Sequence, residues 1–497
     1  MTDLARVPVV VGGGQFTNRN GDPETSPDPF ELMTEAAGRA AASAGSRDWL
    51  ARLTHCWTVH SLSVRHADPA GEVARRIGAP DGIERRCSGM GGNIPQWLVN
   101  RAAELVRSGA RPVVLIVGAE ALATRRRAKK AGIKLNWPSS DGWPDMWPPL
   151  EPDMGVNPLE DAHGLRQATT VYALIESAIA HGAGEDRMTH NRAIGELMAG
   201  LNEVAVANPY SWFSERRDAA DLVTVTGDNR MIATPYPKYL NAVMDVDMSA
   251  AVIVTDAETA RESGIGPDAV AYVRGWSDAS EVWYLSQRAE VHRSPALESC
   301  FSSALGTARV GPDEISAFDL YACFPSSVEV SRDAFRVAQG DTRPLTLTGG
   351  LPYHGGPGSN YVTHAVCNAL EHVRSGAGNA LVHGNGYYLT KHAVGVYSAE
   401  APDSVPEPAE TKDLRTPTLT LEPDASGPAR IVAWTVPYGR DRQAGPGIII
   451  AETRRGTRTI ALADTELTEL LARSDRDLVG ETIEIRPGEK TNVATSP

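Results

Sequence analysis

Apolar residues in this chain follow two alternating patterns, one with helical spacing and one of short continuous runs. Between Asn93 and Arg107 they recur every three or four positions, and the run from Pro112 to Val117 follows. The first pattern predicts a half-buried helix, and the second predicts a strand buried on both faces. Strands that alternate with helices indicate an α/β layered fold.

This helix-and-strand unit occurs twice. The stretch from Gly91 to Glu120 matches the stretch from Gly358 to Gly386 without a gap, and VRSGA ends the helix in both copies. Asn93 then aligns with Asn360. Each helix has few charged positions, so we expect both to lie adjacent and antiparallel at the centre of the fold, between two sheets.

The remaining pattern completes two halves and adds further units. Before the first copy it predicts a strand, a helix, a strand and a helix, at Val7 to Val11, Glu31 to Ala44, His55 to Ser63 and Glu72 to Ile77. Met248 to Thr255 and Val270 to Arg274 predict two more buried strands. Several short alternating strands and one helix follow a segment rich in Pro, Glu and Thr, which has the composition of a linker.

These patterns predict five segments. Residues 1–120 with 245–260 form the first half, and residues 121–244 form a helical insertion that carries a basic run and a tract dense in Trp and Pro. Residues 261–400 form the second half and residues 401–417 the linker. Residues 418–497 form a small β-rich domain that resembles an oligonucleotide-binding (OB-like) barrel.

Composition narrows the classes of partner. The 497 residues carry a net charge of -14, which argues against nucleic acid as the main partner. No apolar run is long enough to span a membrane. The cysteines are odd in number and never in CxxC spacing, so neither a disulfide framework nor a metal site is predicted. A reducing cytoplasm is the simplest location. The cysteines are Cys56, Cys87, Cys300, Cys323 and Cys367.

Glycines precede both repeated helices. A helix that begins after glycines presents unpaired N–H groups and the positive end of its dipole to a ligand. Two such helix starts predict a paired anion or oxyanion site, although they are also compatible with ordinary loops around a duplicated helix. The binding candidates are Gly91, Gly92 and Asn93 in the first copy, and Gly356, Gly358 and Ser359 in the second.

Several strings in this framework resemble motifs of the thiolase superfamily. They are ANPYSW from Ala207, FDLYACF from Phe318, TGGLPYHGGPGSN from Thr348 and VHGNG from Val382. The resemblance covers roughly residues 7 to 400 and is greatest to the thiolase-like protein type 1 branch, which has an extra C-terminal domain. It implies a duplicated, five-layered αβαβα core with a helical insertion between its halves.

The catalytic positions depart from that family. The position of the thiolase nucleophile falls on Gly92, and that of the NEAF or HDCF asparagine or histidine falls on Tyr321. The GHP histidine falls on Gly356. The CxG cysteine falls near Val382, although His383 resembles the histidine of sterol carrier protein thiolases. Classical thiolase activity is therefore not expected.

Four residues are catalytic candidates. Cys87 would act as the nucleophile if a local gap brought it to the helix N-terminus and nearby arginines lowered its pKa, but it is also compatible with a buried packing residue. Tyr321, His354 and His383 would form an acid–base set around a carbonyl or thioester, or else line a pocket kept for binding.

The resemblance implies a lipid-metabolism protein that acts on or binds acyl-CoA thioesters. An acetyl-CoA acetyltransferase-like acyl transfer or a related carbon–carbon bond step is the first hypothesis. The alternatives are a non-catalytic acyl-CoA or lipid-binding module and an aldolase-like enzyme that uses Tyr321. Coenzyme A would be present as substrate or ligand, and no other cofactor is required. The resemblance leaves both a homodimer and a monomer open.

Overall fold

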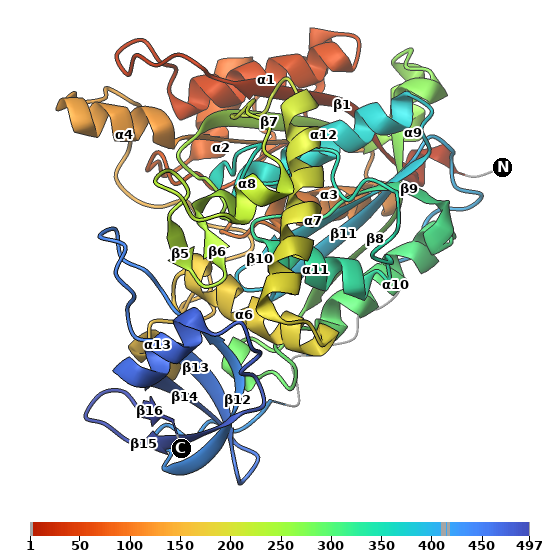
Figure 1. Cartoon of the computed structure of the whole chain (residues 1–497). Helices are drawn as coiled ribbons and strands as arrows, with labels where there is room; N and C mark the ends of the chain where they lie inside the picture. The colour runs from red at the N-terminus through yellow and green to blue at the C-terminus, as the bar shows by residue number, and fades with distance from the viewer. Residues whose placement is uncertain (1–2, 409–413, 415–417, 497) are drawn as a thin grey trace.

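The centre of the protein is a nine-stranded sheet with the order β3-β2-β4-β7-β1-β8-β11-β10-β9. A computed structural model describes residues 3–408, 414 and 418–496 (Figure 1). The first five strands in this order, with their helices, form the first half. Its elements are β1 (Pro8–Thr17), α1 (Pro29–Ser43), β2 (His55–Thr58), α2 (Pro69–Ile77), β3 (Glu84–Cys87), α3 (Ile94–Arg107), β4 (Val114–Ala121) and β7 (Asp247–Asp256).

The second half supplies the other four strands. Its elements are α9 (Ala257–Glu262), β8 (Ala271–Ser280), α10 (Pro295–Ala308), β9 (Ile315–Asp319), α11 (Pro325–Ala334), α12 (Tyr361–Arg374), β10 (Asn379–Gly386) and β11 (Lys391–Ser398). The predicted elements are confirmed as helices and strands, with ends that shift by a few residues. β1, β4 and β10 each continue several residues beyond the apolar runs that predict them.

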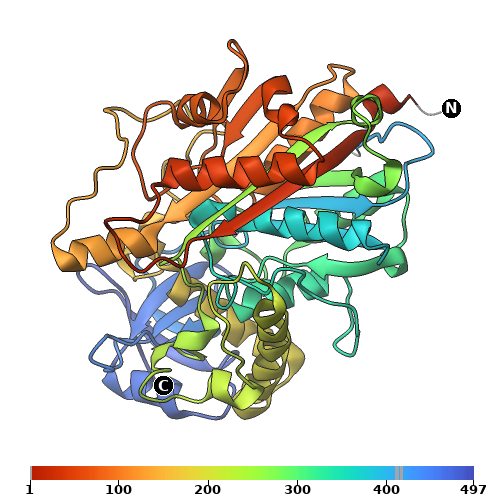
Figure 2. The same cartoon turned by 90° about the horizontal axis from the view of Figure 1, so that it is seen from above.

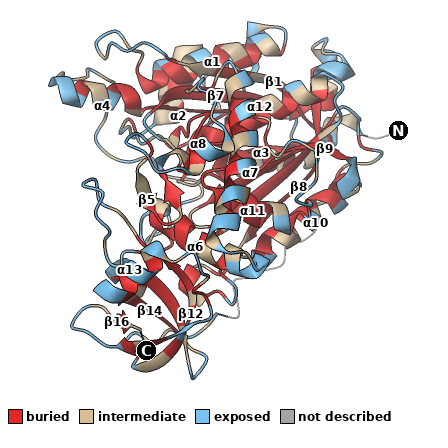
Figure 3. Cartoon of the chain, in the orientation of Figure 1, coloured by how far each residue is buried: buried red, intermediate tan, exposed pale blue. Residues whose placement is uncertain are grey.

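The repeated helices α3 and α12 lie between the two halves. Each contacts β1, β4 and β7 of the first half and also β8, β10 and β11 of the second. On the outer faces, α1 packs against β1, β4 and β7, and α10 packs against β8 and β11. The order is therefore helix, sheet, helix, sheet, helix, which confirms the five-layered fold class. Figure 3 shows that these central elements are largely buried.

The two sheet layers are parts of one continuous sheet, because β1 pairs with β8 through Val9 and Tyr272. One detail of the predicted centre is wrong, because the two helices are not antiparallel. The N-termini of α3 and α12 meet where the Gly91 amide donates to Ser359 Oγ at 3.0 Å. The C-termini of both helices contact the first residues of the chain: Arg107 O accepts a hydrogen bond from Arg6, and Arg374 donates one to Val11 O.

The glycines of β1 explain why that strand is longer than its apolar run. A Cβ at Gly12 would lie 2.1 Å from Ala40 O, and one at Gly14 would lie 2.3 Å from Ala36 O. The glycines therefore let α1 lie directly on the strand, and they do not form a turn. A side chain at either position would push α1 away from the sheet.

Residues 121–244 lie between β4 and β7 in the sequence. They form α4 (Leu122–Ala131), α5 (Pro158–Ala162), α6 (Ala168–Ala183), α7 (Arg187–Ala207), α8 (Ala219–Val223), β5 (Met231–Ala233) and β6 (Tyr236–Pro237). The predicted basic run lies on α4, half of whose residues are exposed (Figure 3). Within the described residues, no helix is long and apolar enough to cross a membrane.

The C-terminal residues form a closed five-stranded barrel at one end of the molecule, visible in Figure 1 and Figure 2. Its elements are β12 (Gly427–Thr435), β13 (Ile448–Thr453), β14 (Arg458–Ala463), α13 (Thr465–Arg473), β15 (Thr482–Arg486) and β16 (Val493–Thr495). The barrel has its own apolar core. Its strand β12 also lies against α6, where the Trp434 amide donates to Ser177 Oγ at 2.9 Å. Most of the second part of the predicted linker, residues 409–413 and 415–417, lies outside the described residues.

Candidate functional site

The N-terminus of α3 carries unpaired backbone donors. Gly91 has a φ of 144°, a value that favours glycine, and its amide donates to Ser359 Oγ. The amides of Gly92 and Asn93 donate no hydrogen bond to any described residue, and Asn93 does not cap the helix with its side chain. Asn93 Oδ1 is buried and also has no partner. The start of α3 can therefore bind an anionic or carbonyl oxygen through two adjacent amides.

Tyr321 fills the space beside Gly92. It follows β9, is 7 % exposed, and stands where a Cβ on Gly92 would lie 2.3 Å from its Oη. The same Cβ would lie 2.5 Å from Asn385 O. A side chain at position 92 and the Tyr321 phenol therefore exclude each other. Burial raises the pKa of Tyr321 far above its ordinary value, so the phenol remains protonated.

Cys87 lies outside this contact. It ends β3, and its Sγ lies 3.7 Å from Ser88 O. Burial raises the pKa of the thiol to about 11. The two arginines expected to activate it pair elsewhere: Arg85 with Asp68 and Arg86 with Glu84. The surroundings of Cys87 are therefore those of a protonated packing residue.

His354 lies near Tyr321 but does not contact it. The rings of both residues pack edge-on against Tyr361, with centroid distances of 5.8 Å and 5.7 Å. His354 Nδ1 lies 3.1 Å from Ser211 Oγ, and Nε2 is buried without a partner. Burial lowers the pKa of His354 well below its ordinary value, so the ring is neutral.

His383 belongs to a separate chain of polar side chains. Its Nδ1 lies 3.2 Å from Ser331 Oγ, and its Nε2 lies 3.2 Å from His392 Nδ1. His392 continues to Ser294 at 3.2 Å. Burial lowers the pKa of His383 to about 3. This ring is held by its neighbours within the second half, and it makes no hydrogen bond to Tyr321.

The glycine-rich segment before α12 meets the one before α3. Gly358 has a φ of 55°, and a Cβ there would lie 2.4 Å from Glu120 Oε1. Ser359 accepts the Gly91 hydrogen bond, whereas the Gly356 amide donates to Val243 O at 2.8 Å. Gly358 and Ser359 therefore lie where the two helix N-termini meet, and the Gly356 amide is already used by the fold.

Sequence analysis missed Glu120 as a site residue. It ends the first repeat, is 1 % exposed, and accepts hydrogen bonds from the Leu62 amide at 2.7 Å and from Ser63 Oγ. Burial raises its pKa to about 7 despite these bonds. A buried carboxyl that titrates near neutrality beside a candidate site is itself a candidate acid or base. The only feature of the sequence that could have identified Glu120 as a site residue is its position at the end of the first repeat.

The Trp/Pro tract of the insertion, residues 137–149, covers the start of α3. The Trp147 amide donates to Cys87 O at 2.9 Å, and the Gly89 amide donates to Pro148 O at 3.1 Å. The Trp147 ring packs against Trp97 and Trp57, with centroid distances of 4.7 Å and 5.3 Å. The tract therefore restricts solvent access to the segment that leads into Gly91.

A second group of titratable side chains lies in another part of the protein. Glu176, His190 and Glu329 are buried, and their ligand atoms lie within 4.8 Å of one another. The three residues come from α6, α7 and α11. No spacing in the sequence signals this group, because each helix supplies one residue.

Comparison with known proteins identifies the family. Residues 406–490 match the model of the thiolase-like protein type 1 additional C-terminal domain. A monomeric SCP2-thiolase like protein type 1 (STLP1) from Mycobacterium smegmatis is 32% identical, with 99% of each chain covered and a TM-score of 0.83. The chain belongs to the thiolase-like protein type 1 family. A comparison with curated proteins found no match.

More distant solved structures share the fold of the family. Human mitochondrial 3-ketoacyl-CoA thiolase is 11% identical over 80% of this chain and 100% of its own, with a TM-score of 0.56. The Ltp2-ChsH2(DUF35) aldolase is 18% identical over 80% of this chain and 99% of its own, with a TM-score of 0.58. Both likenesses show the same fold.

Proposed function

We propose that this protein binds acyl-CoA thioesters where the N-termini of α3 and α12 meet. The free amides of Gly92 and Asn93 support this proposal, because they offer two adjacent donors to a thioester oxygen. Thiolases of the same fold support the choice of ligand: human 3-ketoacyl-CoA thiolase and Acat5 thiolase from Ascaris suum have each been solved in complex with coenzyme A. A role in lipid metabolism follows from this ligand.

The reaction that fits this site best is a carbon–carbon bond step without an acyl-enzyme. The observation that carries this proposal is the exclusion between Gly92 and Tyr321. The resemblance to thiolases assigns their nucleophile to position 92, and the phenol lies beside this position. The fold also occurs in the Ltp2-ChsH2(DUF35) aldolase. Tyr321 is therefore proposed as the catalytic acid, and the two amides as donors to the thioester oxygen.

The protonated phenol can supply the acid of such a reaction. In condensation, Glu120 is the proposed base that takes an α-proton from the thioester. The enolate then attacks a carbonyl carbon, the new bond forms, and Tyr321 gives its proton to the resulting alkoxide. In cleavage, Tyr321 Oη takes the hydroxyl proton as the bond breaks, and Glu120 returns a proton to the enolate carbon. The raised pKa keeps Tyr321 protonated, which is the form that condensation needs. The amides stabilise the enolate oxygen in both directions.

A binding module without chemistry is the second candidate. The limited exposure of the site favours it, since Tyr321 is 7 % exposed and both candidate histidines are almost fully buried. His354 and His383 are also held neutral by burial, which lowers the pKa of each. If the protein is such a binding module, the paired helix N-termini bind the thioester, and the Tyr321 phenol only shapes the pocket.

The proposed assembly follows the relative with the same extra domain. The Mycobacterium smegmatis protein is described as monomeric, which supports a monomer for this chain. A cytoplasmic location remains the prediction from the sequence.

Calorimetric titration with coenzyme A and acetyl-CoA, together with the intact mass of the protein after incubation, tests the proposal. We expect saturable binding and an unchanged protein mass. Binding weakens in Gly92→Ala, because the methyl group displaces Tyr321 or the start of α3. Gly200→Ala is the matched control, since its Cβ meets no atom within 4 Å. Absence of binding contradicts the ligand class, and an acylated cysteine contradicts the non-covalent step.

A further inference from the structure

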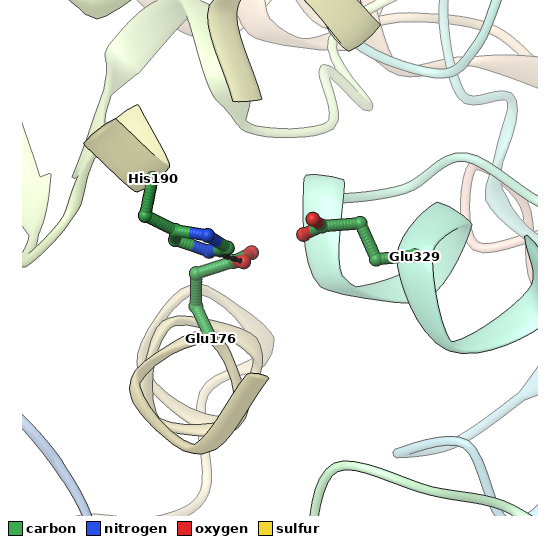
Figure 4. A group of neighbouring side chains, drawn as sticks. All are labelled: Glu176, His190 and Glu329. Carbon is green, nitrogen blue, oxygen red and sulfur yellow. Dashed lines mark hydrogen bonds and ion pairs between the residues drawn. The ribbon is translucent and has the colours of Figure 1, made fainter. Parts of the chain in front are cut away.

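The buried cluster of Glu176, His190 and Glu329 has the ligand types of a transition-metal site. Figure 4 shows the three side chains pointing toward one another from α6, α7 and α11. His190 Nε2 lies 2.6 Å from Glu176 Oε1. All three residues are at least nine-tenths buried, at 0 %, 4 % and 7 % exposure. One imidazole with two carboxylates is a donor set that suits Zn²⁺ and related divalent ions.

Glu329 supplies a second, independent indication of a ligand. Its Oε2 is buried and accepts no hydrogen bond from any donor among the described residues, and the carboxyl group of Glu176 is its neighbour. An unpaired oxygen in such a place costs free energy unless a proton or a cation compensates. A divalent ion would balance the two carboxylates and use this oxygen.

The surrounding side chains already orient the potential ligands. His190 Nδ1 lies 2.8 Å from Glu185 Oε2, which leaves Nε2 to face the cluster. Tyr236 donates its hydroxyl hydrogen to Glu176 Oε2. A metal-bound histidine commonly donates its other ring N–H to a carboxylate, and metal-bound carboxylates are themselves hydrogen-bonded. Both features of an outer ligand shell are therefore present here.

We propose that Glu176, His190 and Glu329 bind one divalent transition-metal ion of the Zn²⁺ class. The ion replaces the hydrogen bond between His190 and Glu176 and is ligated by His190 Nε2 and one oxygen from each glutamate. Displacing the proton from His190 Nε2 leaves a neutral imidazole ligand. Mg²⁺ and Ca²⁺ fit less well, because they prefer oxygen ligands throughout.

Such an ion would join two parts of the protein. α6 and α7 belong to the insertion, and α11 belongs to the second half. A narrow cavity of about 40 Å³ beside the cluster is lined by Glu176, His190 and Trp434 of the barrel strand β12. This cavity offers room for a water molecule as a further ligand. α11 begins four residues after Tyr321, so the ion would also brace the segment that carries the phenol.

Direct metal titration of the full-length protein tests the proposal. The protein is stripped with a chelator and titrated with Co²⁺, whose visible absorption reports its ligands, and then with Zn²⁺. We expect one equivalent of Co²⁺ with a visible band, displacement by Zn²⁺, and a rise in melting temperature with Zn²⁺ but not with Mg²⁺. Absence of saturable binding to the wild-type protein overturns the proposal and leaves a proton-sharing cluster.

Variants of the proposed ligands test whether the Co²⁺ ion binds at this cluster. His190→Gln and Glu329→Gln should each weaken Co²⁺ binding by at least about tenfold. His163→Gln is the matched control, because His163 is a buried histidine that bonds Leu159 and Asn492 outside the cluster. Circular dichroism checks that each variant folds. If a folded Glu329→Gln variant binds the ion as tightly as the wild type, the site lies elsewhere and the proposal fails.

Discussion

A side chain at position 92 would clash with the hydroxyl of Tyr321, because a Cβ on Gly92 would lie 2.3 Å from the phenol oxygen. The Asn385 carbonyl oxygen would lie 2.5 Å from the same Cβ, so two neighbours crowd a side chain at position 92. The resemblance to thiolases assigns their nucleophile to this position, and we propose that the Tyr321 phenol acts beside it as a proton donor.

The first prediction concerns that packing. Gly92→Ala should lower the free energy of unfolding by about 1–3 kcal/mol, because the methyl group meets Tyr321 and the Asn385 carbonyl oxygen. Combining it with Tyr321→Ala should cost less than the sum of the two single changes, by about 0.5–3 kcal/mol. Urea unfolding of the wild type, the two single variants and the double variant measures this coupling. Strictly additive effects would contradict the contact.

Glu120 predicts a specific dependence of stability on pH. Its pKa is about 7 in the folded protein, against an ordinary value of 4.5. Between these values the folded state binds more protons than the unfolded state, so stability is highest at the acidic end and falls as pH rises. Over the whole window this group should contribute a decline of about 3 kcal/mol.

Glu120→Gln should remove this part of the pH dependence. Urea unfolding across the window should show a flatter profile for the variant than for the wild type. Glu35→Gln serves as the control, since Glu35 is an exposed carboxyl paired with Arg39 on α1. Equal slopes in the wild type and Glu120→Gln would show that Glu120 titrates at its ordinary value when folded.

Cys87 should react slowly with thiol reagents. With a pKa of about 11, its thiolate is a very small fraction near neutral pH, and the side chain is 4 % exposed. We expect alkylation by iodoacetamide at least about a hundredfold slower than in the urea-unfolded protein, measured by peptide mass spectrometry. Fast, selective labelling of Cys87 in the folded protein would indicate an activated nucleophile.

The barrel should remain bound to the rest of the protein after the chain is cut between them. Its strand β12 packs on α6, and Ala433, Ile448 and Ile450 belong to the main apolar core. A protease site placed at residues 409–413 would allow cleavage between the two parts. We expect the fragments to elute together in size-exclusion chromatography. Separation into two species would mean that the barrel is only tethered.

The fold was largely predictable from the sequence. The duplicated apolar pattern and the VRSGA repeat located α3, α12 and their strands, because buried elements must be apolar whatever their partners. The orientation of the two helices was not predictable, because it depends on how the halves pack. The continuity of the sheet depends on the β1–β8 pairing, which backbone groups make without a side-chain signal.

The site was predictable only in part. The motifs pointed to Gly92 and Tyr321 as site residues. Their contact could not be predicted, because it depends on the tertiary structure and not on the spacing of the motifs. Glu120 was missed because its raised pKa comes from burial, and the Glu176 cluster because its residues come from three helices. Cys87 attracted attention as the cysteine nearest the expected nucleophile, although in the structure its arginine neighbours turn to other partners.

The most direct test of the proposed chemistry compares Tyr321→Phe with Cys87→Ala in the cleavage and formation of a 3-hydroxyacyl-CoA thioester. Product thioesters are measured by liquid chromatography, and coenzyme A binding is measured in parallel to confirm that the pocket is intact. We expect Tyr321→Phe to lower kcat by about 10²–10⁴-fold with binding retained, whereas Cys87→Ala changes kcat by less than about threefold. Activity that survives Tyr321→Phe and disappears in Cys87→Ala would overturn the role proposed for the phenol.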